Sequence, residues 1–223
     1  QFELHWSAGE IDRMVNARLR AYSDGTVQSF DELLDPDGPL PAFLRIYLAR
    51  FSENSPRDMV RMLYRMLVEE ERLRVGLGHR ISTTAAIAGI QAACEERAQE
   101  LIPEQMLNEL RRLRRVDFTI TELANDIFRI TSPAMSNKIR TWETKGVVER
   151  VQDTRSTGSR PPNRYAISDV RVARVVMQNL DFFQFLNQKL AVCPTCDETL
   201  IRDWDEHTEH LCRCGANVQY VPR

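Results

Sequence analysis

Three features of the sequence predict a mainly α-helical protein whose second half contains two smaller modules. Apolar residues recur at helical spacing through residues 1–102. In residues 103–168, three helical segments precede two short strands around a polar loop. Four of the five cysteines then lie in two close pairs near the C-terminus. The chain therefore combines a helical bundle, a small α/β module and a cysteine-rich end.

The first part of the chain is predicted to be helical throughout, with short connections. Helices are expected over residues 8–22, 40–52, 56–70 and 81–102. The third of these has clear start signals, because Ser55 can cap it and Pro56 suits its first position. Asp58 in its first turn favours the helix dipole. Its apolar stripe is expected to be buried and consists of Met59, Val60, Leu63, Met66 and Leu67.

Residues 103–168 are predicted to form a winged helix-turn-helix. Three helices are expected over 103–113, 119–128 and 132–145. The second begins with the capping box Thr119 and Glu122, the third has Ser132 as its N-cap, and Gly146 suits its C-terminal stop. After this glycine the apolar period changes from 3.6 to 2. The last two elements are strands over residues 147–151 and 163–167, separated by a loop too polar to pack.

The third helix of this module has one apolar and one polar face. Met135, Ile139 and Trp142 fall at helical spacing and are expected to face the core. The opposite face carries short polar groups and cations: Ser136, Asn137, Lys138, Arg140, Thr141 and Thr144. Such groups can bond to base edges and phosphates in a major groove. The hairpin adds Arg155, Arg160 and Arg164, which suit a phosphate backbone. Double-stranded DNA is therefore the predicted partner.

The distribution of charge favours this prediction. Residues 103–167 contain 12 basic and 8 acidic side chains, whereas 1–102 contain 12 and 16, and 168–223 contain 6 and 8. Only the middle segment is cationic, as a polyanion-binding module would be. Glu143 is the one residue against it. The alternatives are that helix and hairpin form a solvated surface, or that they are a platform for another protein.

A single amphipathic helix is predicted to connect this module to the cysteine-rich end. The helix follows Ser168 and Asp169 within the connecting segment 169–190. Its wide apolar face consists of Val172, Val175, Val176, Leu180, Phe183 and Leu186. A face of this kind packs against neighbouring helices or against a second copy in a homo-oligomer.

The last module, residues 191–223, is predicted to be a structural zinc ribbon. Cys193 and Cys196 are followed after fifteen residues by Cys212 and Cys214, so four thiolates can meet in a tetrahedral site. Such a small module needs a cross-link to be stable. The second pair is one residue tighter than usual, so His210, or less favourably His207, is an alternative ligand. Two disulfides are the other alternative, and Cys94 is expected to be an ordinary core residue.

The N-terminal part also resembles a known family. The segments LHWSAGEIDRMVNARLRAY and SENSPRDMVRMLYRMLVEE resemble the helical lid of AAA+/STAND-type P-loop ATPases, including origin-recognition-like initiators, in which a winged helix follows the lid. The resemblance covers residues 1–102 and implies a lid-like domain. The second segment looks like the sensor-2 helix. The position that matches its nucleotide-sensing arginine is Arg57.

The chain departs from that family because it has no Gly-x4-Gly-Lys-Ser/Thr loop and no acidic strand end for magnesium. It is therefore not expected to be an enzyme by itself, and ATP is implied only if an ATPase core precedes Gln1. We expect the DNA-binding C-terminal portion of a P-loop ATPase. The alternatives are a free-standing winged-helix transcription regulator or a protein–protein scaffold. Without a signal peptide or an apolar span, the expected location is the cytoplasm, away from membranes.

Overall fold

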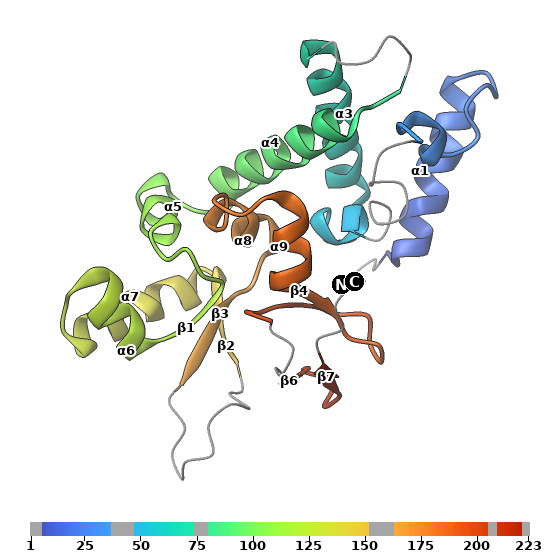
Figure 1. The fold of residues 1–223 in the computed structure, drawn as a ribbon. Helices are drawn as coiled ribbons and strands as arrows, with labels where there is room; N and C mark the ends of the chain where they lie inside the picture. Colours follow the sequence, from blue (N-terminus) through green and yellow to red (C-terminus); the bar gives the residue numbers. More distant parts are fainter. Residues whose placement is uncertain (1–5, 37–46, 74–79, 152–162, 205–208, 220–223) are drawn as a thin grey trace. The chain divides into compact units, whose positions relative to one another are not determined.

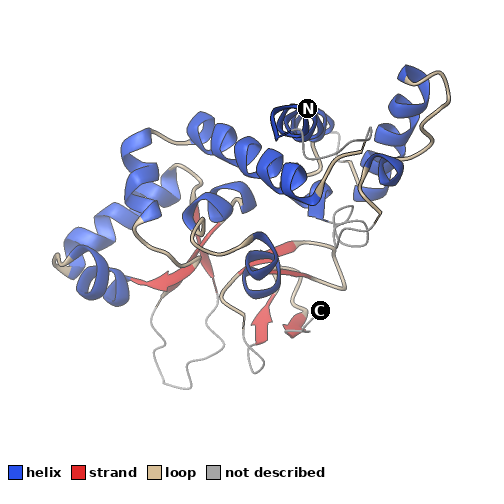
Figure 2. Ribbon diagram, turned by 45° about the horizontal axis from the view of Figure 1, so that its top comes forward, coloured by secondary structure: helices blue, strands red, loops and turns tan. Residues whose placement is uncertain are grey.

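The computed structural model of the protein is mainly helical and contains small antiparallel sheets (Figures 1 and 2). Contacts divide the chain into two compact units, residues 1–96 and 97–223. No helix in the described part of the chain is long and apolar enough to cross a membrane. The described residues are 6–36, 47–73, 80–151, 163–204 and 209–219.

The first unit is built from helices with local start signals. Its elements are α1 (Ala8–Tyr22), the 3-10 helix η1 (Phe30–Leu33), a helical stretch at residues 47–51, α3 (Pro56–Leu73) and most of α4 (Thr83–Leu101). Ser7 and Glu10 form a capping box at α1. The predicted cap of α3 is confirmed, because the Ser55 hydroxyl accepts the Asp58 N–H at 3.3 Å. The predicted helix over 40–52 is described only from residue 47.

The buried face of α3 differs from the prediction. Met59, Met62 and Met66 are buried, whereas Val60 and Leu67 are 37% and 50% exposed. The reason is a close crossing with α4 at Gly89, where an added Cβ would lie 2.5 Å from the Met66 Cα. This crossing turns Met62 and Met66 inward. The apolar stripe of α3 is wider than the surface that α4 covers.

The second unit begins with a small α/β arrangement. Its elements are α5 (Glu104–Arg111), β1 (Asp117–Thr119), α6 (Ile120–Glu122), the π-helix η2 (Leu123–Phe128), α7 (Ser132–Thr144), β2 (Val148–Val151) and β3 (Arg164–Ile167). The strands form an antiparallel sheet in the order β1-β3-β2, with Phe118 opposite Tyr165 and Arg150 opposite Tyr165 on the other side. Strand β1 was not predicted, because three residues are too few to show a period.

Local signals fix the ends of most of these elements. The capping box of Thr119 and Glu122 is confirmed, and Gly146 adopts a left-handed conformation at φ +68° after α7. The predicted cap of α7 was wrong by one residue. Thr131 rather than Ser132 caps it, because its side chain accepts the Ala134 N–H at 3.4 Å. The predicted second helix becomes π-helical after its first turn.

The predicted single helix over 169–190 is wrong, because it is two helices, α8 (Val170–Val176) and α9 (Phe182–Lys189). Asp181 caps α9 through the N–H groups of Phe183 and Gln184. Between the helices, the buried Arg174 donates to the Met177 and Leu180 carbonyls at 3.1 and 3.0 Å. This side chain satisfies carbonyl groups that a continuous helix would have used.

The chain then forms two short hairpins. They are β4 (Leu190–Val192) with β5 (Thr199–Ile201), and β6 (Glu209–Leu211) with β7 (Asn217–Gln219). We call residues 190–204 and 209–219 together the cysteine module. Its small core contains Cys193, Leu200, Trp204, Cys212 and Val218.

The crossing of α3 and α4 predicts the effect of one substitution. Gly89→Ala should destabilise the protein by about 1–3 kcal/mol, because the added methyl would overlap the α3 backbone. Gly9→Ala is the matched control, since its Cβ would meet only the Arg13 side chain at 3.9 Å. The control should be neutral or stabilising by up to about 1 kcal/mol. Urea unfolding measures both, and equal stability of the two variants would contradict the close crossing.

Candidate metal centre and nucleic-acid interface

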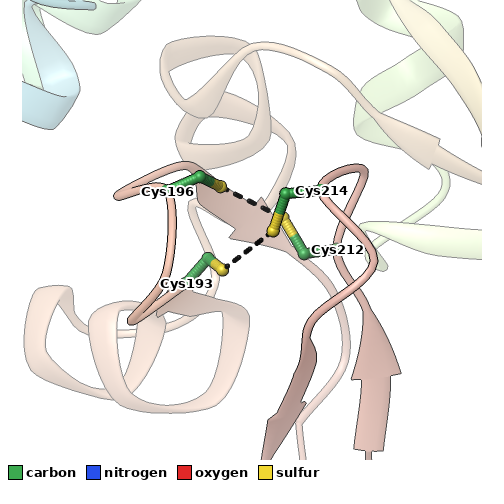
Figure 3. A group of neighbouring side chains, drawn as sticks. All are labelled: Cys193, Cys196, Cys212 and Cys214. Atoms are coloured by element: carbon green, nitrogen blue, oxygen red, sulfur yellow. Dashed lines mark hydrogen bonds between the residues drawn. The ribbon is translucent and has the colours of Figure 1, made fainter.

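Four cysteine side chains converge in the cysteine module (Figure 3). Cys193 and Cys196 come from the β4–β5 connection, and Cys212 and Cys214 from the β6–β7 connection. The Sγ atoms of Cys193 and Cys214 are 3.7 Å apart, those of Cys196 and Cys212 are 3.5 Å apart, and all four lie within 4.8 Å. Tetrahedral zinc with bonds of about 2.3 Å needs sulfur atoms about 3.8 Å apart. The group can therefore hold a metal ion.

The two cysteine loops share one backbone design. In the first, the Cys193 N–H donates to the Glu198 carbonyl and its own carbonyl accepts from Asp197, both at 2.9 Å. In the second, Cys212 makes the equivalent bonds with Ala216 and Gly215, also at 2.9 Å. A left-handed residue directly follows the second cysteine of each loop, at φ +63° and +88°. The tighter second pair therefore still presents both thiols to one point.

Backbone donors favour the thiolate at one of these cysteines. Burial raises the pKa of the Cys193 thiol, but the N–H groups of Cys196 and Thr195 and the neighbouring sulfur groups lower it to about 6. Burial raises the pKa of Cys212 above its ordinary value. The thiolate is the form that binds metals, so donors aimed at a sulfur are what a metal centre requires. No cysteine forms a disulfide.

The histidine alternative is not favoured by the packing. His210 is 2% exposed and its ring lies edge-on to Trp204 at a centroid distance of 4.7 Å. The convergent group consists of the four predicted cysteines without it. His207 lies outside the described residues. Cys94, in α4, is fully buried as predicted.

The polar face of α7 is accessible within its unit. Asn137, Arg140, Thr141 and Thr144 are exposed, and Ser136 is half-buried. The Thr141 and Thr144 hydroxyls donate to the carbonyls of Asn137 and Arg140, at 3.1 and 2.8 Å. Met135, Ile139 and Trp142 are buried on the opposite side, as the apolar period predicts. The helix therefore presents a row of amide, guanidinium and methyl-bearing groups.

Two predicted DNA contacts are already occupied by acidic partners. The Lys138 ammonium pairs with Glu109 at 2.6 Å and lies 5.6 Å from the Phe128 ring centre. The Arg164 side chain is 12% exposed and pairs with Asp117 at 2.7 Å. Both cations stabilise contacts between elements of their own unit, so neither is available to an external partner as Arg140 is. Arg155 and Arg160 lie outside the described residues.

Two other cations near α7 were missed by sequence reasoning. Arg129 is exposed in the left-handed turn before the helix, and Lys145 is exposed at its C-terminal end. Like Arg140, they form no ion pair among the residues that the structure describes. The signal for Arg129 was its place in the short turn between two helices. Arg129, Arg140 and Lys145 therefore replace Lys138 and Arg164 as the accessible cations.

The predicted nucleotide-sensing residue lies in the first unit. Arg57 is exposed in the first turn of α3. Val60, Tyr64 and Leu67 follow it at helical spacing and are 37%, 62% and 50% exposed. The helix therefore presents a cation followed by apolar side chains on its open face.

Comparison with known proteins leaves these sites to be interpreted from their chemistry. The chain has no significant match among protein families, curated proteins or solved structures.

The convergent thiols make a specific prediction for metal binding. Protein purified under reducing conditions should contain one tetrahedral metal ion per chain, and Cys193→Ser should lower the affinity for Zn²⁺ by at least about 100-fold. Cys94→Ala is the control, because that cysteine lies outside the group, and it should keep the metal. Elemental analysis and chelator competition measure both. A folded, reduced wild-type protein that binds no Zn²⁺ would contradict the assignment.

Proposed function

We propose that the chain is a DNA-binding protein that binds through a winged helix-turn-helix, residues 103–168. A structural zinc ribbon follows this module in the chain. The observation that carries the proposal is the exposed face of α7, with Asn137, Arg140 and Thr141 in a row between two further cations that have no ion pair among the described residues. A side-chain set of this kind suits base edges and phosphates of a duplex. The helix is the recognition helix of the proposal.

The order of the elements supports this assignment. Two helical segments precede α7, and a short turn at residues 129–131 separates it from the second. Strands β2 and β3 follow directly and pair with each other. In a winged helix, the third helix enters the major groove and the hairpin lies along the neighbouring backbone. The wing predicted from the sequence, with Arg155 and Arg160, lies outside the described residues.

Zinc is the proposed metal because four thiolates form a soft, tetrahedral donor set. When bound, the ion supplies a cross-link between two loops that have little apolar core of their own. Four protein ligands leave no open position for a water molecule. The proposed role is therefore structural.

Residues 1–102 are proposed to be the helical lid of a P-loop ATPase whose core would lie before Gln1. Two features of α3 support this: Arg57 is exposed in its first turn, and the apolar side chains behind it are also exposed. Both suit a face that packs on a nucleotide-binding core. If the complete reading frame encodes no P-loop, the proposed lid role is wrong and a free-standing winged-helix regulator is favoured.

The proposed interface predicts a loss of affinity on removal of its cations. The triple variant Arg129→Ala, Arg140→Ala, Lys145→Ala should bind a random 20-bp duplex at least about 10-fold more weakly at low salt, because phosphate contacts dominate affinity. Its plot of log affinity against log salt should be less steep by about 2–3. Fluorescence anisotropy at several salt concentrations measures both quantities.

The matched control removes the same charge from exposed positions of α1 in the first unit, as Arg13→Ala, Arg18→Ala, Arg20→Ala. This variant should keep most of the wild-type affinity. Equal losses in the two variants would assign the binding to net charge rather than to α7. If the wild type does not bind duplex DNA, the proposed function is wrong.

A further inference from the structure

The cysteine module and the three-stranded sheet meet across charged side chains. Strand β2 lies at one edge of the sheet, because the strand order is β1-β3-β2. A cavity of about 230 Å³ lies between this strand and the second cysteine loop. Its walls include Arg150 and Val151 on one side and Leu211 and Cys212 on the other. The apolar side chains at this edge are therefore separated by a cavity, and charged side chains share its lining.

Ion pairs to Glu149 cross the same edge. The Glu149 carboxylate, in β2, contacts the guanidinium of Arg213 and lies 3.6 Å from that of Arg202. Arg202 follows β5 and is largely buried, and burial lowers its pKa to about 10. Glu149 is itself only 24% exposed. Removal of the Glu149 charge would therefore take this partner away from the largely buried Arg202.

The position of Arg213 connects this ion pair to the metal centre. Arg213 lies between Cys212 and Cys214, two of the proposed ligands, so a bound metal ion would hold its backbone from both sides. Its guanidinium also approaches the Glu198 carboxylate at 3.6 Å. The backbone of the second cysteine loop and one ion pair thus connect the proposed metal ligands to β2.

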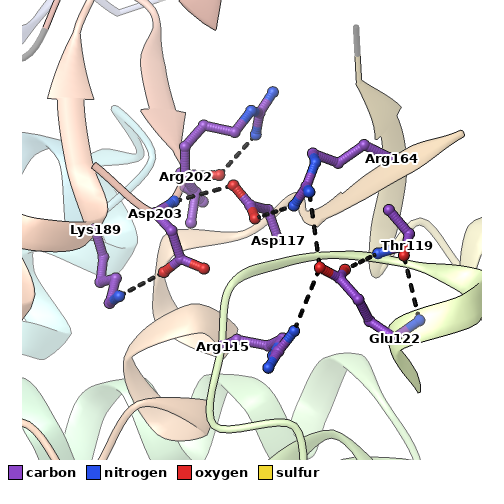
Figure 4. A network of polar contacts seen from close by, with 9 residues as sticks. Arg115, Asp117, Thr119, Glu122, Arg164, Lys189, Arg202 and Asp203 are labelled. Atoms are coloured by element: carbon purple, nitrogen blue, oxygen red, sulfur yellow. Dashed lines mark hydrogen bonds and ion pairs between the residues drawn. The ribbon is translucent and has the colours of Figure 1, made fainter. Parts of the chain in front are cut away.

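Strand β1 is attached to the cysteine module by a different route (Figure 4). The Asp117 carboxylate accepts the Asp203 N–H at 3.1 Å and the Arg164 guanidinium at 2.7 Å, and its side chain is 1% exposed. Asp203 also pairs with Lys189 of α9. None of these residues adjoins a cysteine of the metal group. The β1 contact should therefore persist when the metal is removed.

We propose that the metal centre positions strand β2 through the Arg213–Glu149 ion pair, which makes these two residues positioning residues of the sheet. The inference rests on the proposed metal site. Glu149 is three residues from Gly146, which ends α7, and the Val147 N–H bonds to the Trp142 carbonyl at 3.0 Å. The metal thereby also steadies the C-terminal end of α7, where Lys145 would contact DNA.

Thermodynamic coupling gives a test that needs no DNA. If metal binding stabilises the ion pair, the ion pair must stabilise metal binding by the same factor. Glu149→Gln should therefore weaken Zn²⁺ binding at least about fivefold in chelator competition. Electrostatics alone predicts tighter Zn²⁺ binding, because the substitution removes an anion near a four-thiolate site that has a net negative charge. Unchanged or tighter Zn²⁺ binding by Glu149→Gln would overturn the proposal.

Further variants separate positioning from folding. Arg213 is 70% exposed, so Arg213→Ala should fold. It should weaken Zn²⁺ binding. In the double variant with Glu149→Gln, the two losses of affinity should not add. Arg213→Lys should restore part of the affinity. Glu143→Gln, a half-buried acid of α7, is the control and should bind Zn²⁺ as the wild type does. Additive losses of Zn²⁺ affinity from Arg213→Ala and Glu149→Gln in the double variant would contradict the coupling.

Hydrogen exchange provides an independent readout on the same proteins. Removal of Zn²⁺ from the wild type should accelerate exchange of β2 amides, Val148–Val151, more than that of β1 amides, Asp117–Thr119. In Glu149→Gln this difference should already be present with the metal bound. Equal protection of β2 with and without Zn²⁺ would overturn the proposal. If the wild type binds no Zn²⁺ at all, the metal site itself fails, which is a different result.

Discussion

The packing of Trp142 is the constraint on which the rest of the second unit depends. Its ring lies 6.3 Å from that of Phe118 in β1 and 6.2 Å from that of Phe128 in η2, and it is 1% exposed. One side chain therefore joins the sheet, the second helical segment and α7. Because a helix has a fixed period, burial of this residue determines which side of α7 is left in water. The candidate interface is a consequence of that burial.

The charged residues of this unit have two different roles. Lys138 and Arg164 are paired with acids and hold elements together, whereas Arg129, Arg140 and Lys145 are accessible and unpaired in the described part of the chain. Exposed cations lower the stability of the fold little, because water solvates them. They contribute to binding of a polyanion mainly through release of counterions. Paired, half-buried cations would first have to lose their acidic partners. If α7 binds DNA as proposed, the unit uses one set of cations for stability and another for recognition.

Local signals explain which features could be predicted from the sequence. The capping box of Thr119 and Glu122, the glycine after α7 and the inward face of Trp142 each depend on residues close together in the chain. The four converging cysteines were predicted from the spacing within and between their two pairs. The break after α8 depends on Arg174 reaching two carbonyls. The exposure of Val60 and the ion pair of Arg164 depend on residues distant in sequence. Single-sequence periodicity carries no information on such long-range contacts.

The central claim is that duplex DNA contacts the exposed face of α7, and backbone amide chemical shifts during a titration with a short duplex test it most directly. The account predicts that the largest changes occur at Asn137, Arg140 and Thr141, while the amides of α1 and α3 are unaffected. Changes confined to the first unit, or unchanged α7 amides in a protein that binds the duplex, would contradict it.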